Sequence, residues 1–102
     1  MSELKTDQHT VTRSKEKLKH PSMYKVLLHN DDYTTMEFVV YVLETIFHKS
    51  SAEAMQIMLH VHKNGFGVCG VFTHEIAETK VVAVHDLAKK YEFPLRASFE
   101  EA

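Results

Sequence analysis

Cysteine is almost absent from this chain, which contains one, Cys69, in 102 residues. No disulfide can therefore form within the chain, and a single domain must be held together by its hydrophobic core, which is feasible at about 100 residues. Cys69 lies in an apolar segment, residues 68–72, which favours an inert core thiol over a reactive one. So low a cysteine content fits a reducing compartment.

Long apolar runs and an excess of basic residues are also missing. The longest uninterrupted apolar run, Phe38–Leu43, has six residues, whereas a membrane-spanning helix needs about 20. The net charge is −2 and the pI is about 6.4, which is unlike a general nucleic-acid binder. The first 20 residues have no apolar core typical of a signal peptide, and their acidic residues are atypical of a transit peptide. We expect a cytoplasmic protein that binds neither membranes nor nucleic acid.

The sequence motifs of common enzymes are absent as well. Three glycines occur in all, and neither a phosphate-binding loop nor a nucleophile elbow is found. The eight histidines are scattered, without the spacing of a zinc site. We therefore expect no enzymatic activity, no cofactor and no metal. A small hydrolase would require a catalytic triad that no local pattern reveals.

The beginning of the chain differs in character from the rest. Residues 1–20 are polar and show no hydrophobic period. Such a segment cannot bury enough apolar surface to offset the entropy of ordering it. The sequence predicts a disordered tail over residues 1–20 and one folded domain over residues 21–102.

The folded part predicts three strands and three helices. Two capping-box pairs, Thr34 with Glu37 and Ser50 with Glu53, mark helix starts, and Gly65 marks a helix end. The order β-α-α-β-α-β indicates an α/β (α+β) fold, a two-layer sandwich with a three-stranded antiparallel sheet. In chain order we expect a strand over 23–29, helices over 35–47 and 50–64, a strand over 68–72, a helix capped by Thr73 whose buried stripe ends at Tyr91, and an edge strand over 95–99.

An acidic turn, Asn30-Asp31-Asp32, directly precedes the first predicted helix. Its side chains offer many acceptor oxygens in a small space. One interpretation is a turn held by its own side chains and favoured by the helix dipole. The other is a cation site for a metal or an organic ammonium. Calcium normally takes about six to eight oxygen ligands, whereas an ammonium needs three acceptors.

His62 lies late in the second helix, on its apolar side. It is either a satisfied boundary residue or a ligand-binding group. His60 projects to a different side of the helix, so the two cannot chelate one metal from one face. Met36, Met55 and Met58 are likewise either core filler or part of an adaptable binding surface. The residue pattern by itself leaves these alternatives open.

These residues resemble the ClpS adaptor family, and the resemblance covers about residues 21–99. The first signature combines an apolar strand with the acidic turn and a helix start. The second signature begins with Val61-His62 and includes a Cys-Gly-Val-Phe-Thr segment. The matching segments are Met23–Val26, Asn30–Thr34, Met36–Val39, Val61-His62 with Gly65, Cys69–Thr73, Glu75, Ala77–Lys80 and Phe93-Pro94-Leu95.

The resemblance implies an adaptor that binds proteins by their N-terminal residue and delivers them to a protease. Members bind N-degrons that begin with Leu, Phe, Tyr or Trp, and hand them to the N-domain of the AAA+ unfoldase ClpA. By position, Asn30, Asp31 and His62 would hold the free α-amino group and the first peptide unit of the degron. The side-chain pocket would be lined by Thr34, Met36, Val39, Met58, Val61 and Leu95. Glu75, Thr79 and Lys80 would face ClpA, and the tail would act during delivery.

One position departs from the family pattern, because Thr35 stands where the family commonly has proline. Threonine can occupy the start of a helix, so we expect little functional effect. Val42 and Leu43 could each contribute to the pocket. A competing hypothesis is a structural domain similar to the C-terminal domain of the ribosomal stalk, but such a domain would not need an ammonium-binding group of residues. We expect a monomer.

Overall fold

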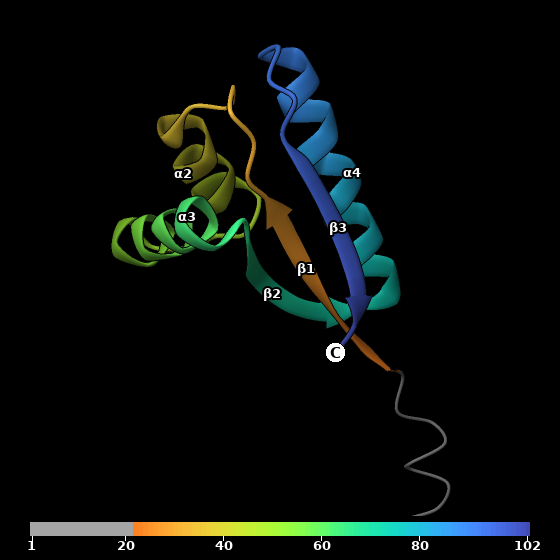
Figure 1. Ribbon diagram of the computed structural model, residues 1–102. Coiled ribbons are helices and arrows are strands. Elements are labelled where there is room, and N and C mark those ends of the chain that lie inside the picture. Colours follow the sequence, from red (N-terminus) through yellow and green to blue (C-terminus); the bar gives the residue numbers. More distant parts are fainter. Residues whose placement is uncertain (1–21) are drawn as a thin grey trace, which may run out of the picture.

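The computed structural model describes residues 22–102, so the predicted tail lies outside the described part of the chain. The elements follow the predicted order β-α-α-β-α-β (Figure 1). They are β1 Met23–His29, α2 Met36–Thr45, α3 Ser51–Asn64, β2 Phe66–Thr73, α4 His74–Lys90 and β3 Arg96–Glu101.

The three strands form an antiparallel sheet in the order β2-β1-β3. β1 pairs with both other strands and lies in the centre, and its middle residues Val26, Leu27 and Leu28 are buried. β3 is an edge strand, as predicted. The register between β1 and β2 shifts at a bulge, which leaves Cys69 without a partner on β1.

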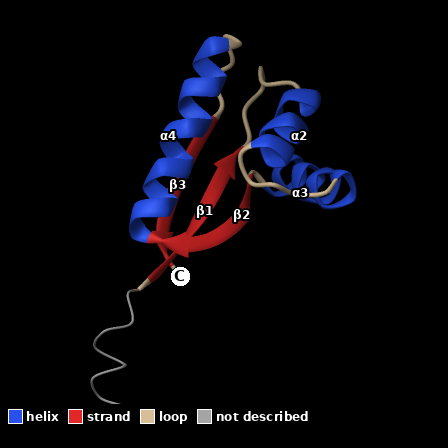
Figure 2. Cartoon of the chain, turned by 180° about the vertical axis from the view of Figure 1, so that it is seen from behind, coloured by secondary structure: helices blue, strands red, loops and turns tan. Residues whose placement is uncertain are grey.

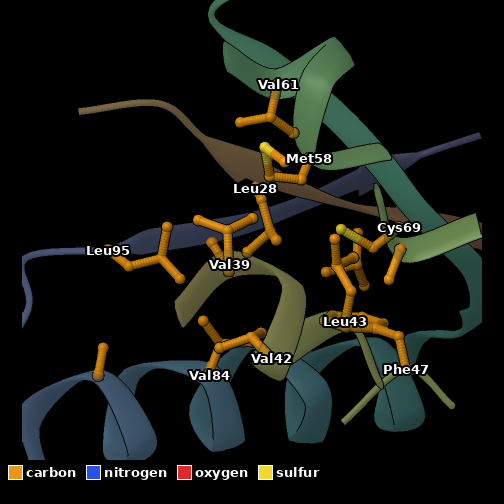
Figure 3. Close-up of a cluster of buried hydrophobic side chains, with 14 of the residues drawn as sticks. Leu28, Val39, Val42, Leu43, Phe47, Met58, Val61, Cys69, Val84 and Leu95 are labelled. Atoms are coloured by element: carbon orange, nitrogen blue, oxygen red, sulfur yellow. The ribbon is translucent and has the colours of Figure 1, made fainter. Parts of the chain in front are cut away.

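Helix α4 forms a layer against the sheet, whereas α2 and α3 form a pair at the end of the sheet. α4 contacts all three strands, and α2 packs against α3 (Figure 1; Figure 2). Between them lies one hydrophobic core, shown in Figure 3. Cys69 is 1% exposed in this core, and desolvation by burial raises the pKa of its thiol to about 12. The thiol is therefore protonated and inert, as its sequence context indicates.

The start of α2 differs from the prediction by one residue. The N-cap is Thr35, whose Oγ1 accepts a hydrogen bond from the Phe38 N–H at 3.1 Å. The predicted pairing of Thr34 with Glu37 is wrong, because the Thr34 hydroxyl donates instead to the carboxylate of Asp31 at 2.7 Å. The helix also ends at Thr45 rather than at residue 47.

The predicted boundaries of α3 are close to those observed. Ser50 and Glu53 form the predicted capping box. Gly65 ends the helix in the left-handed conformation, with φ of 91°. β2 begins directly after it, two residues earlier than predicted. A Cβ at Gly67 would lie 2.8 Å from Cγ2 of Val61, so this glycine lets β2 pack closely against α3.

α4 begins after Thr73, although the threonine side chain makes no capping hydrogen bond. Its end is closed by bonds from the N–H of Phe93 to Ala88 O and from the N–H of Glu92 to Lys89 O. This is the pattern of a Schellman motif, with Glu92 at φ of 63° in the place that glycine usually takes. The prediction that Tyr91 is buried is wrong, since it is 48% exposed beyond the last helical turn.

Candidate functional site

A cavity of about 210 Å³ lies where the loop after β1 meets the start of α2 and the last turns of α3. Eight of the nine predicted pocket residues line it, and Asp32 joins them. The sequence offered a signal for Asp32, because it belongs to the same acidic turn. The lining residues are Asn30, Asp31, Asp32, Thr34, Met36, Val39, Met58, Val61 and His62.

Asp31 organises the loop and supplies its fixed negative charge. Its Oδ1 accepts the N–H groups of Tyr33 and Thr34 at 2.8 and 2.6 Å, and its Oδ2 accepts the Thr34 hydroxyl at 2.7 Å. Desolvation by burial acts to raise the pKa of Asp31, but these hydrogen bonds from Thr34 and Tyr33 together lower it below its ordinary value. The carboxylate is therefore ionised at neutral pH. The turn is held by its own side chain, and it also presents a charge to the cavity.

The polar side of the cavity joins residues that are far apart in the sequence. The N–H of Asn30 donates to Gly65 O at 2.8 Å, which places the loop against the end of α3. His62 lies in the last turn of that helix. Both Asn30 and His62 are exposed, so their side chains are accessible to a ligand.

The floor of the cavity is apolar. Val39, Met58 and Val61 are 7%, 5% and 2% exposed. Met36 is different, because 46% of its surface is exposed. The cavity therefore combines a buried aliphatic floor, an accessible methionine and a polar rim.

Three residues that the sequence associates with the pocket do not line it. Val42 and Leu43 are completely buried and belong to the core. Leu95 is 3% exposed and belongs to the same core cluster as Val39 (Figure 3). In this structure Leu95 supports the core and does not reach the cavity surface.

The second predicted surface lies at the start of α4. Glu75 and Thr79 are exposed one turn apart, and the Thr79 hydroxyl donates to Glu75 O at 2.9 Å. Lys80 is half-buried, and its Nζ donates to Ile46 O at 2.6 Å. The same ammonium lies 5.8 Å from the ring centroid of Phe72. Lys80 thus fixes the end of α2 to α4.

Residues 22–102 contain no group of three or more His, Cys, Asp or Glu side chains placed to hold a metal ion. Across the same residues, no helix has the length and apolar character needed to cross a membrane.

An apolar floor beneath an acidic, hydrogen-bonding rim on a small two-layer sandwich is the arrangement of a ligand-binding domain. A model of the family "ATP-dependent Clp protease adaptor protein ClpS" matches residues 19–98. The chain therefore belongs to the ClpS family, whose members are adaptors, and the expectation that it is not an enzyme is confirmed.

Curated relatives and a solved structure support the same family. An ATP-dependent Clp protease adapter protein ClpS from Rhodospirillum centenum is 59% identical over 91 residues, which cover 89% of this chain and 84% of the relative. One from Myxococcus xanthus is 57% identical over 96 residues, covering 92% and 90%. Agrobacterium tumefaciens ClpS2, solved bound to L-phenylalaninamide, is 41% identical with a TM-score of 0.79, covering 81% of this chain and all of that one. The predicted fold class is confirmed by this likeness.

Proposed function

We propose that this chain binds proteins whose N-terminal residue is Leu, Phe, Tyr or Trp and delivers them to a ClpA-type AAA+ unfoldase. The observation that carries the proposal is the meeting of an ionised carboxylate, an amide and an imidazole at the rim of one apolar cavity. A free protein N-terminus combines the same two chemistries, since a cationic α-amino group stands beside the first side chain.

The rim suits an ammonium better than a metal ion. An ammonium donates three hydrogen bonds, and Asn30, Asp31 and His62 each present an acceptor. Both oxygens of Asp31 already accept bonds from the loop, but a carboxylate has about four acceptor sites. Asp31 thus contributes its charge and one further acceptor. Exposed Asp32 adds a second carboxylate to the rim.

The floor suits one bulky apolar side chain. The cavity of about 210 Å³ is smaller than the roughly 300–1,000 Å³ typical of drug-sized ligands. A structural relative, ClpS2, has been solved with L-phenylalaninamide, a ligand that consists of one aromatic residue with a free amine. This supports the same ligand class for the present chain.

The expected affinity follows from opposing terms. Each charge-assisted hydrogen bond contributes about 1.5–3 kcal/mol, and burial of a Leu or Phe side chain about 1.5–3 kcal/mol. The loss of translational and rotational freedom opposes these gains. A dissociation constant near 1 μM, about −8 kcal/mol, is consistent with this balance.

Delivery to the unfoldase is proposed to use α4 and the tail. Glu75 and Thr79 are exposed and accessible to a partner, whereas Lys80 would act partly by holding α2 and α4 together. Deletion of residues 1–17 is expected to leave folding and peptide affinity intact and to abolish delivery. A monomeric state and a cytoplasmic location belong to the same proposal.

The decisive test compares a Leu-initiated peptide with its N-acetylated form by fluorescence anisotropy. Acetylation removes the cation and two of its donors, so binding of the acetylated peptide should be lost. Degradation of a Leu-initiated reporter by the unfoldase and its protease, with and without this protein, tests delivery. Equal affinity for the two peptides would refute recognition of the ammonium.

A further inference from the structure

An aromatic cluster lies on the surface between α2 and the end of α4, and the degron site does not use it. The ring of Phe38 lies 4.7 Å from that of Phe93 and 5.6 Å from that of Tyr91, and the Tyr41 and Tyr91 rings are 6.1 Å apart. Phe38 is 6% exposed, but Tyr41 and Tyr91 are 43% and 48% exposed. The two tyrosines of this aromatic cluster, whose rings are tilted or edge-on to one another, are therefore accessible to solvent.

Two open hollows flank Tyr41, each of about 430 Å³. One is lined by Glu37 and the aromatic cluster, and the other by residues of both helices that include Ile46, Asp86 and Leu87. The two hollows share Tyr41, and each is lined by residues of α2 together with residues of α4 or of the segment that follows it; the pair is here called the aromatic groove. It shares no lining residue with the cavity of the candidate site.

The aromatic groove is continuous with the proposed unfoldase surface. Asp86 follows Thr79 by seven residues and Glu75 by eleven, spacings that place all three on one side of α4. A second connection runs through Lys80, whose ammonium binds Ile46 O at the edge of the groove. A partner that covers the start of α4 would therefore reach the groove by extending along the same helix.

The size of protein interfaces favours such an extension. A stable interface usually involves about 20–30 residues a side, many more than the six residues of Glu75–Lys80. Exposed aromatic residues, tyrosine above all, are enriched among the residues that carry most of the binding energy. Tyr41 lies at the centre of the aromatic groove and has this character.

Charge indicates what kind of segment fits. Each hollow contains a carboxylate, Glu37 in one and Asp86 in the other. Lys90 lines the same hollow as Asp86, so the two carboxylates outnumber the cations of the lining by one. Lys80 lies outside the lining and is bound to Ile46 O. The aromatic faces and the carboxylates favour an apolar anchor next to a lysine or arginine.

We propose that the aromatic groove is a second docking site for the same unfoldase, and that it receives a partner segment with an apolar side chain beside a basic one. The inference rests on the proposed function, because the unfoldase is the partner that function assigns. It makes Tyr41 an anchor residue for the partner, remote from the degron cavity.

The test titrates the full-length protein against the full-length ClpA-type unfoldase and, separately, against a Leu-initiated peptide. Tyr41→Ala and Asp86→Lys should each weaken unfoldase binding about tenfold, while peptide affinity stays unchanged and a thermal melt shows that each variant remains folded. Leu59→Ala is the matched control, because Leu59 is 51% exposed on α3 and lines none of these hollows. Glu75→Arg tests the proposed unfoldase surface itself.

The outcomes separate the two proposals. If Glu75→Arg weakens unfoldase binding while Tyr41→Ala and Asp86→Lys do not, the groove is not a docking site and the proposed function stands. If Leu59→Ala weakens binding as much as Tyr41→Ala, the role of the groove is refuted as well. If neither Glu75→Arg nor the two groove variants weaken unfoldase binding, the proposed partner surface on α4 is wrong, and the inference built on it fails too.

Discussion

The N–H of Asn30 donates to the carbonyl oxygen of Gly65 at 2.8 Å, and this bond ties the acidic turn to the end of α3. Gly65 itself has φ of 91°, a conformation that L-residues with a side chain rarely adopt. The polar rim of the candidate site therefore depends on a glycine that contributes no functional group.

Gly65→Ala should destabilise the fold by about 1–2 kcal/mol, because a Cβ disfavours the left-handed conformation. Peptide affinity should fall as well, because Gly65 accepts the hydrogen bond of the Asn30 N–H and directly follows the helical turn that contains His62. Urea unfolding and peptide anisotropy measure the two effects. A Gly65→Ala variant as stable as the parent would contradict the argument.

Glu92→Gly is the opposite case, because Glu92 has a side chain at φ of 63°. This substitution should stabilise the protein by about 1 kcal/mol.

Stability should depend on pH through Asp31. The pKa of its carboxyl is lower in the folded protein than its ordinary value of 3.8, so the folded state favours the ionised form. This contribution is fully present above the unfolded pKa and is lost as pH falls through the folded pKa. The stability difference between the parent and Asp31→Asn should therefore be constant from about pH 7 to 5 and shrink below about pH 4.

Urea unfolding of both proteins at pH 7 and pH 3 checks this prediction. Asp32→Asn is the matched control, because the loop N–H groups are bound by Asp31 and not by its neighbour. A stability difference that persists unchanged at pH 3 would show that the charge of Asp31 is not what stabilises the loop.

Local patterns predicted the elements well and the contacts between them less well. Ser50 and Glu53 lie three residues apart and bind each other, so their spacing contains all the information needed. Thr34 has the same spacing to Glu37, but its hydroxyl binds Asp31. The residue that caps α2 depends on how the preceding loop folds. In this loop the Thr34 hydroxyl binds Asp31 and not the start of the helix, and the spacing of a capping box does not reveal this.

The same distinction applies to the candidate site. Eight of its residues could be assigned by resemblance, because the family pattern includes their positions. Leu95, assigned to the pocket by the same resemblance, lies in the core and outside the cavity lining. The difference between lining a cavity and supporting it from the core depends on packing, which a sequence pattern does not contain. Tyr91 continues the apolar stripe of α4 in the sequence, yet the helix ends before it and leaves it exposed.

Met36 should control which side chains enter the cavity. It is 46% exposed and begins α2 beside the acidic turn, so its flexible side chain can narrow the entrance. Met36→Ala should admit peptides that begin with Ile or Val, because more space near the Cβ tolerates branching. Met55→Ala is the control, since Met55 is 47% exposed and lies outside the cavity lining. If the Met36 variant binds Leu normally and still rejects Ile and Val, Met36 is not the gate.

His62 should act as a hydrogen-bond acceptor for the α-amino group. Its exposed ring lines the cavity at the end of α3, across from the loop that contains Asn30. His62→Ala removes the acceptor and should weaken peptide binding roughly 10- to 100-fold, because a hydrogen bond to a charged group contributes about 1.5–3 kcal/mol. His62→Gln keeps an acceptor oxygen and should restore part of the affinity.

His60→Ala provides the matched control for this prediction. His60 is exposed two residues away, does not line the cavity, and has its Nδ1 within 3.0 Å of the side-chain nitrogen of Asn64. Its removal should leave the affinity for a Leu-initiated peptide unchanged. Anisotropy titrations of the three variants at neutral pH decide the question. Equal losses for His62→Ala and His62→Gln would mean that the imidazole is not an acceptor, because the substitution that preserves an acceptor would then bring no benefit.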